Sequence, residues 1–147
     1  MMAGDLLQRY AWASDSQDRE ALASCFAPDG RLLISDGGAQ TRCVATGGAA
    51  IAQWVYDRHA AEFAAGHRRR HMTTMPVLSS APGHIASRSY FSVLVGDQAG
   101  PRVAAMGWYD DEMVCQQGLW TFQSRTVHVE ARGEQAPFTH FNPGDKP

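Results

Sequence analysis

The sequence predicts a single α+β domain in which helices come first and a curved antiparallel sheet follows and packs against them. Apolar residues recur at helical spacing before Gly66 and alternate with polar residues after it. The 147 residues suffice for one domain with a core of its own and are few for two. A curved sheet that wraps a long helix leaves a cone, whose open end is a natural ligand pocket.

The first two helices are predicted from spacing and capping. Apolar side chains recur at helical spacing over residues 5–14. The polar stretch SDSQD follows, and Asp18 within it can cap a second helix, REALASCF. The Pro-Asp-Gly sequence at 28–30 predicts a turn that ends this helical unit.

A hairpin and the longest helix are predicted next. The segments RLLISD and TRCVAT have strand composition, and GGAQ between them is a plausible hairpin loop. Gly47 and Gly48 precede the helical segment AAIAQWVYDRHAAEFAA, and Gly66 is the signal that stops it. One face of this helix would carry Ile51, Trp54, Val55 and Arg58.

Four long antiparallel strands are predicted after the long helix. Their sequences are RRRHMTTMPVLSS, HIASRSYFSVLVG, PRVAAMGWYDDEMV and LWTFQSRTVHVE, and turn signals divide them. Residues 131–147 hold several prolines and glycines and should form an irregular tail. We therefore expect one domain over 1–147 with its core at about 5–130, and FTHFNP in the tail as a lid over the pocket.

Composition and charge exclude several classes of partner. The net charge of −2 provides no global field for nucleic acid or anionic lipid, and no apolar run approaches the roughly 18–20 residues of a membrane span. The start of the chain lacks the pattern of a secretion signal, so we expect a cytoplasmic protein. The three cysteines are widely spaced and should be free thiols. No metal, phosphate-loop or other cofactor motif is present, and we expect no cofactor.

The segment RRRHMTT is the most informative stretch of the chain. Neighbouring residues of a strand point to opposite faces, so the three arginines split between faces and form no basic stripe. A solvated rim is the expected role of Arg68–Arg70. His71 lies deeper in the strand, where it is either a working base or a histidine whose ring is satisfied within the core.

Several segments in order resemble one protein family. The opening RYAWASDSQDREALASCFAPDGRLLI, the strand RRRHMTTMPVL, the strand ASRSYFSVLV and the ending GWYDDEMVCQQGLWTFQSRTV resemble the SnoaL-like branch of the nuclear transport factor 2-like superfamily. The resemblance extends over about Leu6 to Val129. It implies a cone-like curved sheet around a long helix, as in scytalone dehydratase, hexachlorocyclohexane dehydrochlorinase and polyketide cyclases.

The resemblance also implies a catalytic pair. In the first two of these enzymes an aspartate after the first helix pairs with a histidine on the strand that follows the long helix, and the matching residues are Asp15 and His71. The chain departs from scytalone dehydratase at Ser14, where that enzyme has a tyrosine, and near Val95, where it has a second catalytic histidine. A carboxylate that holds one imidazole nitrogen makes the other nitrogen a better base, which is sound chemistry without the family.

Five further residues are candidates for substrate contact: Tyr10, Ser14, Trp54, Tyr109 and Arg125. Strand parity places Tyr109 with Ala105 and Gly107, and it either donates a hydrogen bond to the substrate or packs in the sheet. Trp54 is either part of the core or a platform for the ligand. Arg125 and His128 have opposite parity, so at most one of them faces the cavity unless a bulge intervenes.

These observations predict a cofactor-independent acid–base enzyme of the dehydratase, cyclase or isomerase type that acts on a small hydrophobic, aromatic or polycyclic molecule. The alternative is a non-catalytic ligand-binding or structural accessory domain of the same fold. We also expect a homo-oligomer, a trimer rather than a dimer, because SYFSVLV is apolar on both faces and the family relatives associate through the sheet. Neither nucleic acid nor a membrane is an expected partner.

Overall fold

Three helices and seven strands follow one another along residues 3–36 and 40–133, the parts of the chain that the computed structural model describes. Their order is α1 (Ala3–Ser16), α2 (Arg19–Ala23), β1 (Phe26–Asp36), β2 (Arg42–Thr46), α3 (Gly48–Ala64), β3 (Arg68–Thr73), β4 (Val77–Ala81), β5 (His84–Asp97), β6 (Gly100–Gln116) and β7 (Leu119–Arg132). The architecture is α+β with helices first, as the sequence predicts.

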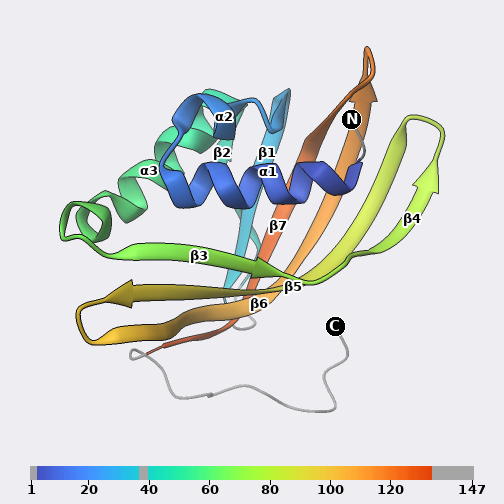
Figure 1. The fold of residues 1–147 in the computed structure, drawn as a ribbon. Helices are drawn as coiled ribbons and strands as arrows, with labels where there is room; N and C mark the ends of the chain where they lie inside the picture. The colour runs from blue at the N-terminus through green and yellow to red at the C-terminus, as the bar shows by residue number, and fades with distance from the viewer. Residues whose placement is uncertain (1–2, 37–39, 134–147) are drawn as a thin grey trace.

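All strands belong to one curved sheet with the order β2-β1-β7-β6-β5-β3. Strands β3 and β4 pair with successive stretches of the same edge of β5. Every strand pair is antiparallel except β1 with β7, which is parallel, so the sheet is mixed. In Figure 1, α1 crosses in front of β1 and β7, and α2 and α3 lie beside one another at the end of α1.

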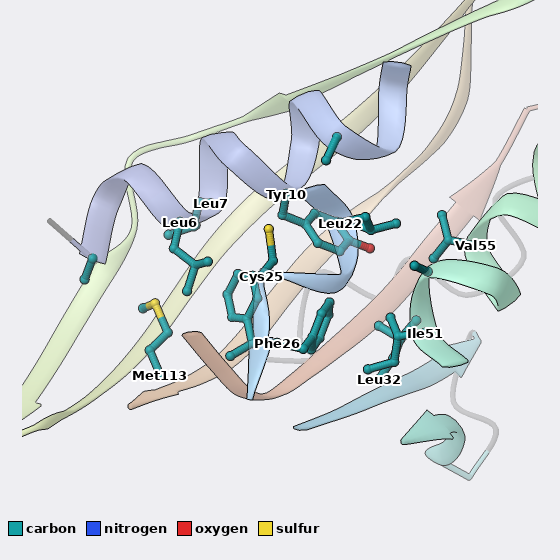
Figure 2. Close-up of a cluster of buried hydrophobic side chains, with 14 residues drawn as sticks. Leu6, Leu7, Tyr10, Leu22, Cys25, Phe26, Leu32, Ile51, Val55 and Met113 are labelled. Atoms are coloured by element: carbon teal, nitrogen blue, oxygen red, sulfur yellow. The ribbon is translucent and has the colours of Figure 1, made fainter. Parts of the chain in front are cut away.

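The core forms where the helices meet the concave side of the sheet. Apolar side chains of α1 at helical spacing, Leu6 and Tyr10 among them, pack against Phe122 of β7 and Met113 of β6. Ile51 from α3 closes the same cluster from the other side, and Figure 2 shows the cluster with Leu6, Tyr10, Met113 and Ile51 among the labelled side chains. Burial of this apolar surface holds α1 across the sheet and so fixes the position of its C-terminal turn.

Two sequence signals for helix ends are confirmed. The side chain of Asp18 accepts a hydrogen bond from the backbone N–H of Ala21 at 3.0 Å and caps α2. Gly66 follows α3 with a φ of +85°, a left-handed conformation that glycine adopts without strain. Among the described residues, no helix is both long and apolar enough to cross a membrane.

The turn predicted at residues 28–30 is wrong, because β1 begins at Phe26 and continues through it. The register of β1 against β7 shifts between Phe26 and Arg31, so the Pro-Asp-Gly sequence forms an irregular stretch inside the strand. A Cβ atom at Gly30 would lie 2.7 Å from the carbonyl oxygen of Phe122. Glycine is therefore needed there for the close approach of β1 to β7.

The strand predicted over 68–80 is also corrected, since it is two strands. β3 ends at Thr73 and β4 begins at Val77, and Pro76 between them has no N–H to donate to a ladder. At the other end β7 continues to Arg132, two residues beyond the predicted strand. Residues 37–39 of the predicted GGAQ loop, residues 134–147 of the predicted tail and the predicted FTHFNP lid lie outside the described residues.

Candidate active site

Asp15 and His71 meet although 56 positions separate them in the sequence. Asp15 lies in the last turn of α1, and His71 lies in the middle of β3, which packs along that helix. The His71 Nδ1 atom is 2.6 Å from Asp15 Oδ1, and the His71 backbone N–H donates to Asp15 Oδ2 at 2.9 Å. One carboxylate thus holds both the ring and the backbone of the histidine.

This arrangement leaves the other ring nitrogen of His71 available. The two side chains are only 10% and 12% exposed, so water competes weakly for the bond between them. A carboxylate beside Nδ1 favours the tautomer that carries the proton there, and Nε2 then holds the free lone pair. Within the described part of the chain, Nε2 has no hydrogen-bond partner.

His71 lines a cavity of about 80 Å³ between the helices and the sheet. Its apolar wall consists of Leu32, Ile34, Val55, Phe91, Val93, Ala105, Val127 and Val129. Its polar and aromatic lining consists of Tyr10, Ser14, Trp54, His59, His71 and Tyr109. Four arginines complete the lining, and the exposure of Arg42 and Arg58 places them at the rim. A mostly apolar chamber with a few convergent polar groups is the usual form of a small-molecule site.

The structure brings four of the five predicted contact residues to this cavity. Tyr10 and Ser14 reach it from α1, Trp54 from α3 and Tyr109 from β6. The rings of Tyr10 and His71 lie 6.4 Å apart between centroids, and Tyr10 and Tyr109 are separated by the same distance. Asp15 lies behind His71 and reaches the cavity through it.

Arg125 does not take the position predicted for it, because it lies behind the tyrosines instead of lining the cavity. Its side chain is 1% exposed and donates to Asp111 from Nε at 2.7 Å and from an Nη atom at 2.8 Å. The guanidinium carbon lies 4.0 Å from the ring centroid of Tyr109 and 4.2 Å from those of Tyr10 and Phe122. Arg125 therefore packs against the rings of Tyr10 and Tyr109 on the side away from the cavity and holds them in position.

Burial shifts the pKa values of Tyr10 and Tyr109, which line the cavity, and of Arg125 behind them. Desolvation raises the pKa of Tyr109 and of Tyr10, so both phenols are neutral hydrogen-bond donors at neutral pH. Burial alone would lower the pKa of Arg125, and the Asp111 carboxylate reverses this effect and raises it. Arg125 consequently remains a cation beneath two neutral hydroxyl-bearing rings.

His59 is a cavity residue that the sequence analysis missed as a site candidate. It lies on α3, four positions after the buried Val55, and that spacing is the signal that could have found it. Burial, followed by the positive charge of Arg69, lowers the pKa of His59 to about 4, although the Glu62 carboxylate opposes this change. Its imidazole is therefore neutral at pH 7.

Metal-binding clusters and disulfides do not contribute to the site. The described residues include no group of three or more histidine, cysteine or acidic side chains placed to hold a metal ion. Cys25, Cys43 and Cys115 are free thiols, as predicted.

The chain belongs to the SnoaL-like domain family, whose pattern matches residues 3–126. Among the solved structures that resemble it is a nuclear transport factor 2-like protein with a cystatin-like fold from Novosphingobium aromaticivorans. That protein is 23% identical, the match covers 86% of this chain and 78% of the other, and the TM-score is 0.72. The predicted family and fold are thus confirmed. No sequence among curated proteins matches this chain.

Two other structures place the fold among proteins of different kinds. A protein of Catenulispora acidiphila solved in complex with S-DNPA is 25% identical, with 85% of this chain and 88% of that chain covered and a TM-score of 0.71. The beta subunit of a putative aromatic-ring-hydroxylating dioxygenase from Novosphingobium aromaticivorans is 19% identical, with 86% of each chain covered and a TM-score of 0.68. The fold alone therefore does not determine what a protein of this family does.

Proposed function

We propose that this protein is a cofactor-independent acid–base enzyme, of the dehydratase, cyclase or isomerase type, that acts on a small hydrophobic molecule. The observation that carries the proposal is the 2.6 Å contact between Asp15 Oδ1 and His71 Nδ1 beside a mostly apolar cavity. Such a pair contributes on the order of 10²–10⁴-fold as a positioned base. The S-DNPA complex of the relative from Catenulispora acidiphila supports a small-molecule ligand in this fold.

In the proposed reaction, His71 Nε2 removes a proton from a carbon next to a carbonyl or to a leaving group. The Asp15 carboxylate stabilises the imidazolium that forms and keeps the ring in place. The hydroxyl of Tyr109 or Tyr10 donates a hydrogen bond to the substrate oxygen on which negative charge develops. Apolar walls exclude water and strengthen these electrostatic interactions.

The size of the cavity limits how the substrate can lie. Its volume of about 80 Å³ is well below the roughly 300–1,000 Å³ of typical ligand pockets. The cavity therefore holds the reacting part of the molecule, and the remainder rests on the rim near Trp54 and Arg58. The same small volume favours the second candidate function, a binding or accessory domain whose interior is largely filled by side chains.

Exchange of carbon-bound protons separates the two candidates. We expect the protein to accelerate deuterium uptake at the α-carbons of 2-indanone and 2-tetralone in D₂O, followed by NMR. His71→Ala and Asp15→Asn should each reduce this acceleration by at least about a hundredfold. His84→Ala is the matched control, because His84 also pairs with a carboxylate, Glu112, but both side chains are nearly half exposed.

Wild-type exchange no faster than that of His71→Ala would contradict the acid–base role and favour the binding domain. Exchange that falls equally in His84→Ala would assign the acceleration to surface histidines. The circular dichroism spectra of the variants should match that of the wild type, because none of the three residues belongs to the buried apolar clusters.

We further propose self-association through the outer face of the sheet. Tyr90 on β5 points away from the cavity side and is 55% exposed, with half-buried Leu94 further along the same strand face. The predicted homo-oligomer, trimer or dimer, remains a prediction that sedimentation velocity tests. Tyr90→Lys should shift the distribution toward the monomer if this face is the contact.

A further inference from the structure

Four arginines from four separate elements line the cavity: Arg42 of β2, Arg58 of α3, Arg69 of β3 and Arg132 of β7. No carboxylate is among the described residues that line it. This concentration of positive charge stands against a net charge of −2 for the chain as a whole. A cationic rim around one small cavity raises the local concentration of an anionic ligand there.

Two of these arginines are already paired with neighbouring acids. Arg69 pairs with Glu62 of α3 at 2.8 Å, and Arg132 pairs with Asp36 at the end of β1 at 2.5 Å. In both pairs the acid offsets part of the charge of the arginine, which stays in the lining of the cavity. They therefore define the walls without providing the free cations that an anion needs.

Arg42 and Arg58 have no ion-pair partner anywhere in the part of the chain that the structure describes. The guanidinium carbon of Arg58 lies 5.3 Å from the ring centroid of Trp54, a contact that holds the flat guanidinium group against an aromatic face. A guanidinium held in this way keeps its N–H groups available for two parallel hydrogen bonds.

The electrostatics of Arg58 agree with an excess of positive charge at the rim of the cavity. Burial first, and then the charges of Arg132, Arg42 and Arg69, lower its pKa, and Asp36 is the acid that opposes them. A cation held beside like charges is stabilised by any anion that enters the group. A bound carboxylate would therefore supply negative charge to a site that has an excess of positive charge.

We infer that the ligand of this cavity is an aromatic carboxylate, whose carboxylate group is bound at the rim by Arg58 and Arg42 while its ring enters toward His71. This inference rests on the proposed function for the chemistry at His71, but the binding that it describes does not require turnover. The planar fork of arginine matches a carboxylate in two-point hydrogen bonding, and the apolar wall suits the ring. Convergence of the arginines on one concave site, instead of a stripe along the surface, points to a small molecule.

Isothermal titration calorimetry with phenylacetate and its uncharged isostere phenylacetamide tests the inference directly. We expect the wild-type protein to bind phenylacetate at least about tenfold more tightly than phenylacetamide, with the difference shrinking at high salt. Arg58→Gln and Arg42→Gln should each reduce this preference, and the double variant should abolish it. Arg70→Gln is the matched control, because Arg70 is exposed on β3, has the same charge and does not line the cavity.

Three results would overturn the inference. These are equal affinity for the acid and the amide, an unchanged preference in the Arg58→Gln/Arg42→Gln variant, and a loss in Arg70→Gln as large as that in Arg58→Gln. His71→Ala and Asp15→Asn alter the cavity at the ring end and can change the absolute affinity, but both should keep the preference for phenylacetate over phenylacetamide, because both keep Arg58 and Arg42. Failure of proton exchange with retained carboxylate binding would therefore count against the proposed reaction alone, and loss of the carboxylate preference would count against the anion site alone.

Discussion

Two aspartates in the interior pair with basic side chains, and the two pairs differ in access and in chemistry. Asp15 and His71 are joined at 2.6 Å, are 12% and 10% exposed, and lie beside the cavity. Asp111 and Arg125 are joined by two hydrogen bonds, are 0% and 1% exposed, and lie behind the tyrosines. Both pairs are held with similar geometry, so geometry alone does not distinguish their roles.

The two pairs differ in whether the basic partner, His71 or Arg125, can release a proton. Imidazole changes its protonation near neutral pH, whereas guanidinium keeps its proton in proteins. The His71 ring has a free nitrogen at the cavity, whereas the Arg125 side chain is enclosed by three aromatic rings. The first pair is therefore suited to move a proton, and the second is suited to hold Tyr10 and Tyr109 in position.

The largest effect on stability is expected at the enclosed pair. Asp111→Asn leaves the Arg125 charge buried without a counter-ion and should lower the free energy of unfolding by about 3–5 kcal/mol. Urea denaturation followed by tryptophan fluorescence measures the change. The double variant Asp111→Leu/Arg125→Met, which removes both charges, should recover a large part of the loss. If the double variant is no more stable than Asp111→Asn, packing and not the unpaired charge is responsible.

The second largest effect on stability depends on pH and comes from the protonation of His59. Its pKa falls from 6.5 to about 4 on folding, so between these values the unfolded chain binds a proton that the folded chain does not. Stability should therefore be complete above about pH 6.5 and decline as the pH falls toward about 4, by a total of about 2–3 kcal/mol. Denaturation of His59→Gln at pH 7.5 and pH 5 should show a smaller decline than the wild type does.

The exposed His84 provides the comparison for that measurement. His84→Gln changes the same residue type at a position that is 45% exposed, and it should leave the pH dependence of the wild type in place. A decline in His59→Gln as steep as that of the wild type would mean that Glu62 and Arg69, which flank the ring, carry the dependence instead.

The sequence alone was sufficient for one pair and not for the other. The resemblance and the alternation of β3 identify Asp15 and His71, and the family match over residues 3–126 supports that resemblance. The pairing of Asp111 with Arg125 depends on a bulge: β6 and β7 pair Met113 with Phe122, and the register then shifts by one residue. Without that shift Asp110 would lie opposite Arg125. Local patterns do not reveal such a shift, because it arises from contacts between strands.

The arginines at the rim show a similar limit. Arg42, Arg58 and Arg132 are dispersed over 90 positions of the sequence and belong to three elements, so no local motif joins them. The predicted face of α3 carried Ile51, Trp54, Val55 and Arg58, and the last three of these line the cavity. Their meeting at one cavity follows from the sheet order, in which β2, β1 and β7 are neighbours.

Asp15→Asn should have a smaller effect on stability than Asp111→Asn has. The amide can still accept a hydrogen bond from the His71 backbone N–H, and an imidazole, unlike a guanidinium, is not a permanent cation, so no buried charge is left unpaired. We expect a loss of about 1–2 kcal/mol in the free energy of unfolding, together with the loss of proton exchange proposed above. A loss as large as that of Asp111→Asn would show that the cavity pair also has a major structural role.

The smallest effect on stability is expected at the ion pair of Asp110, the neighbour of Asp111 in the sequence, with Arg88. Asp110 points to the outer face of β6, where it accepts hydrogen bonds from Arg88 at 2.6 and 3.0 Å, and these two side chains are 33% and 46% exposed. The contact has the same two-point geometry as the Asp111–Arg125 pair, but solvent screens it. Arg88→Gln should therefore reduce the free energy of unfolding by less than about 1 kcal/mol in the same urea titration. A cost near that of Asp111→Asn would mean that burial is not what separates the two neighbouring pairs.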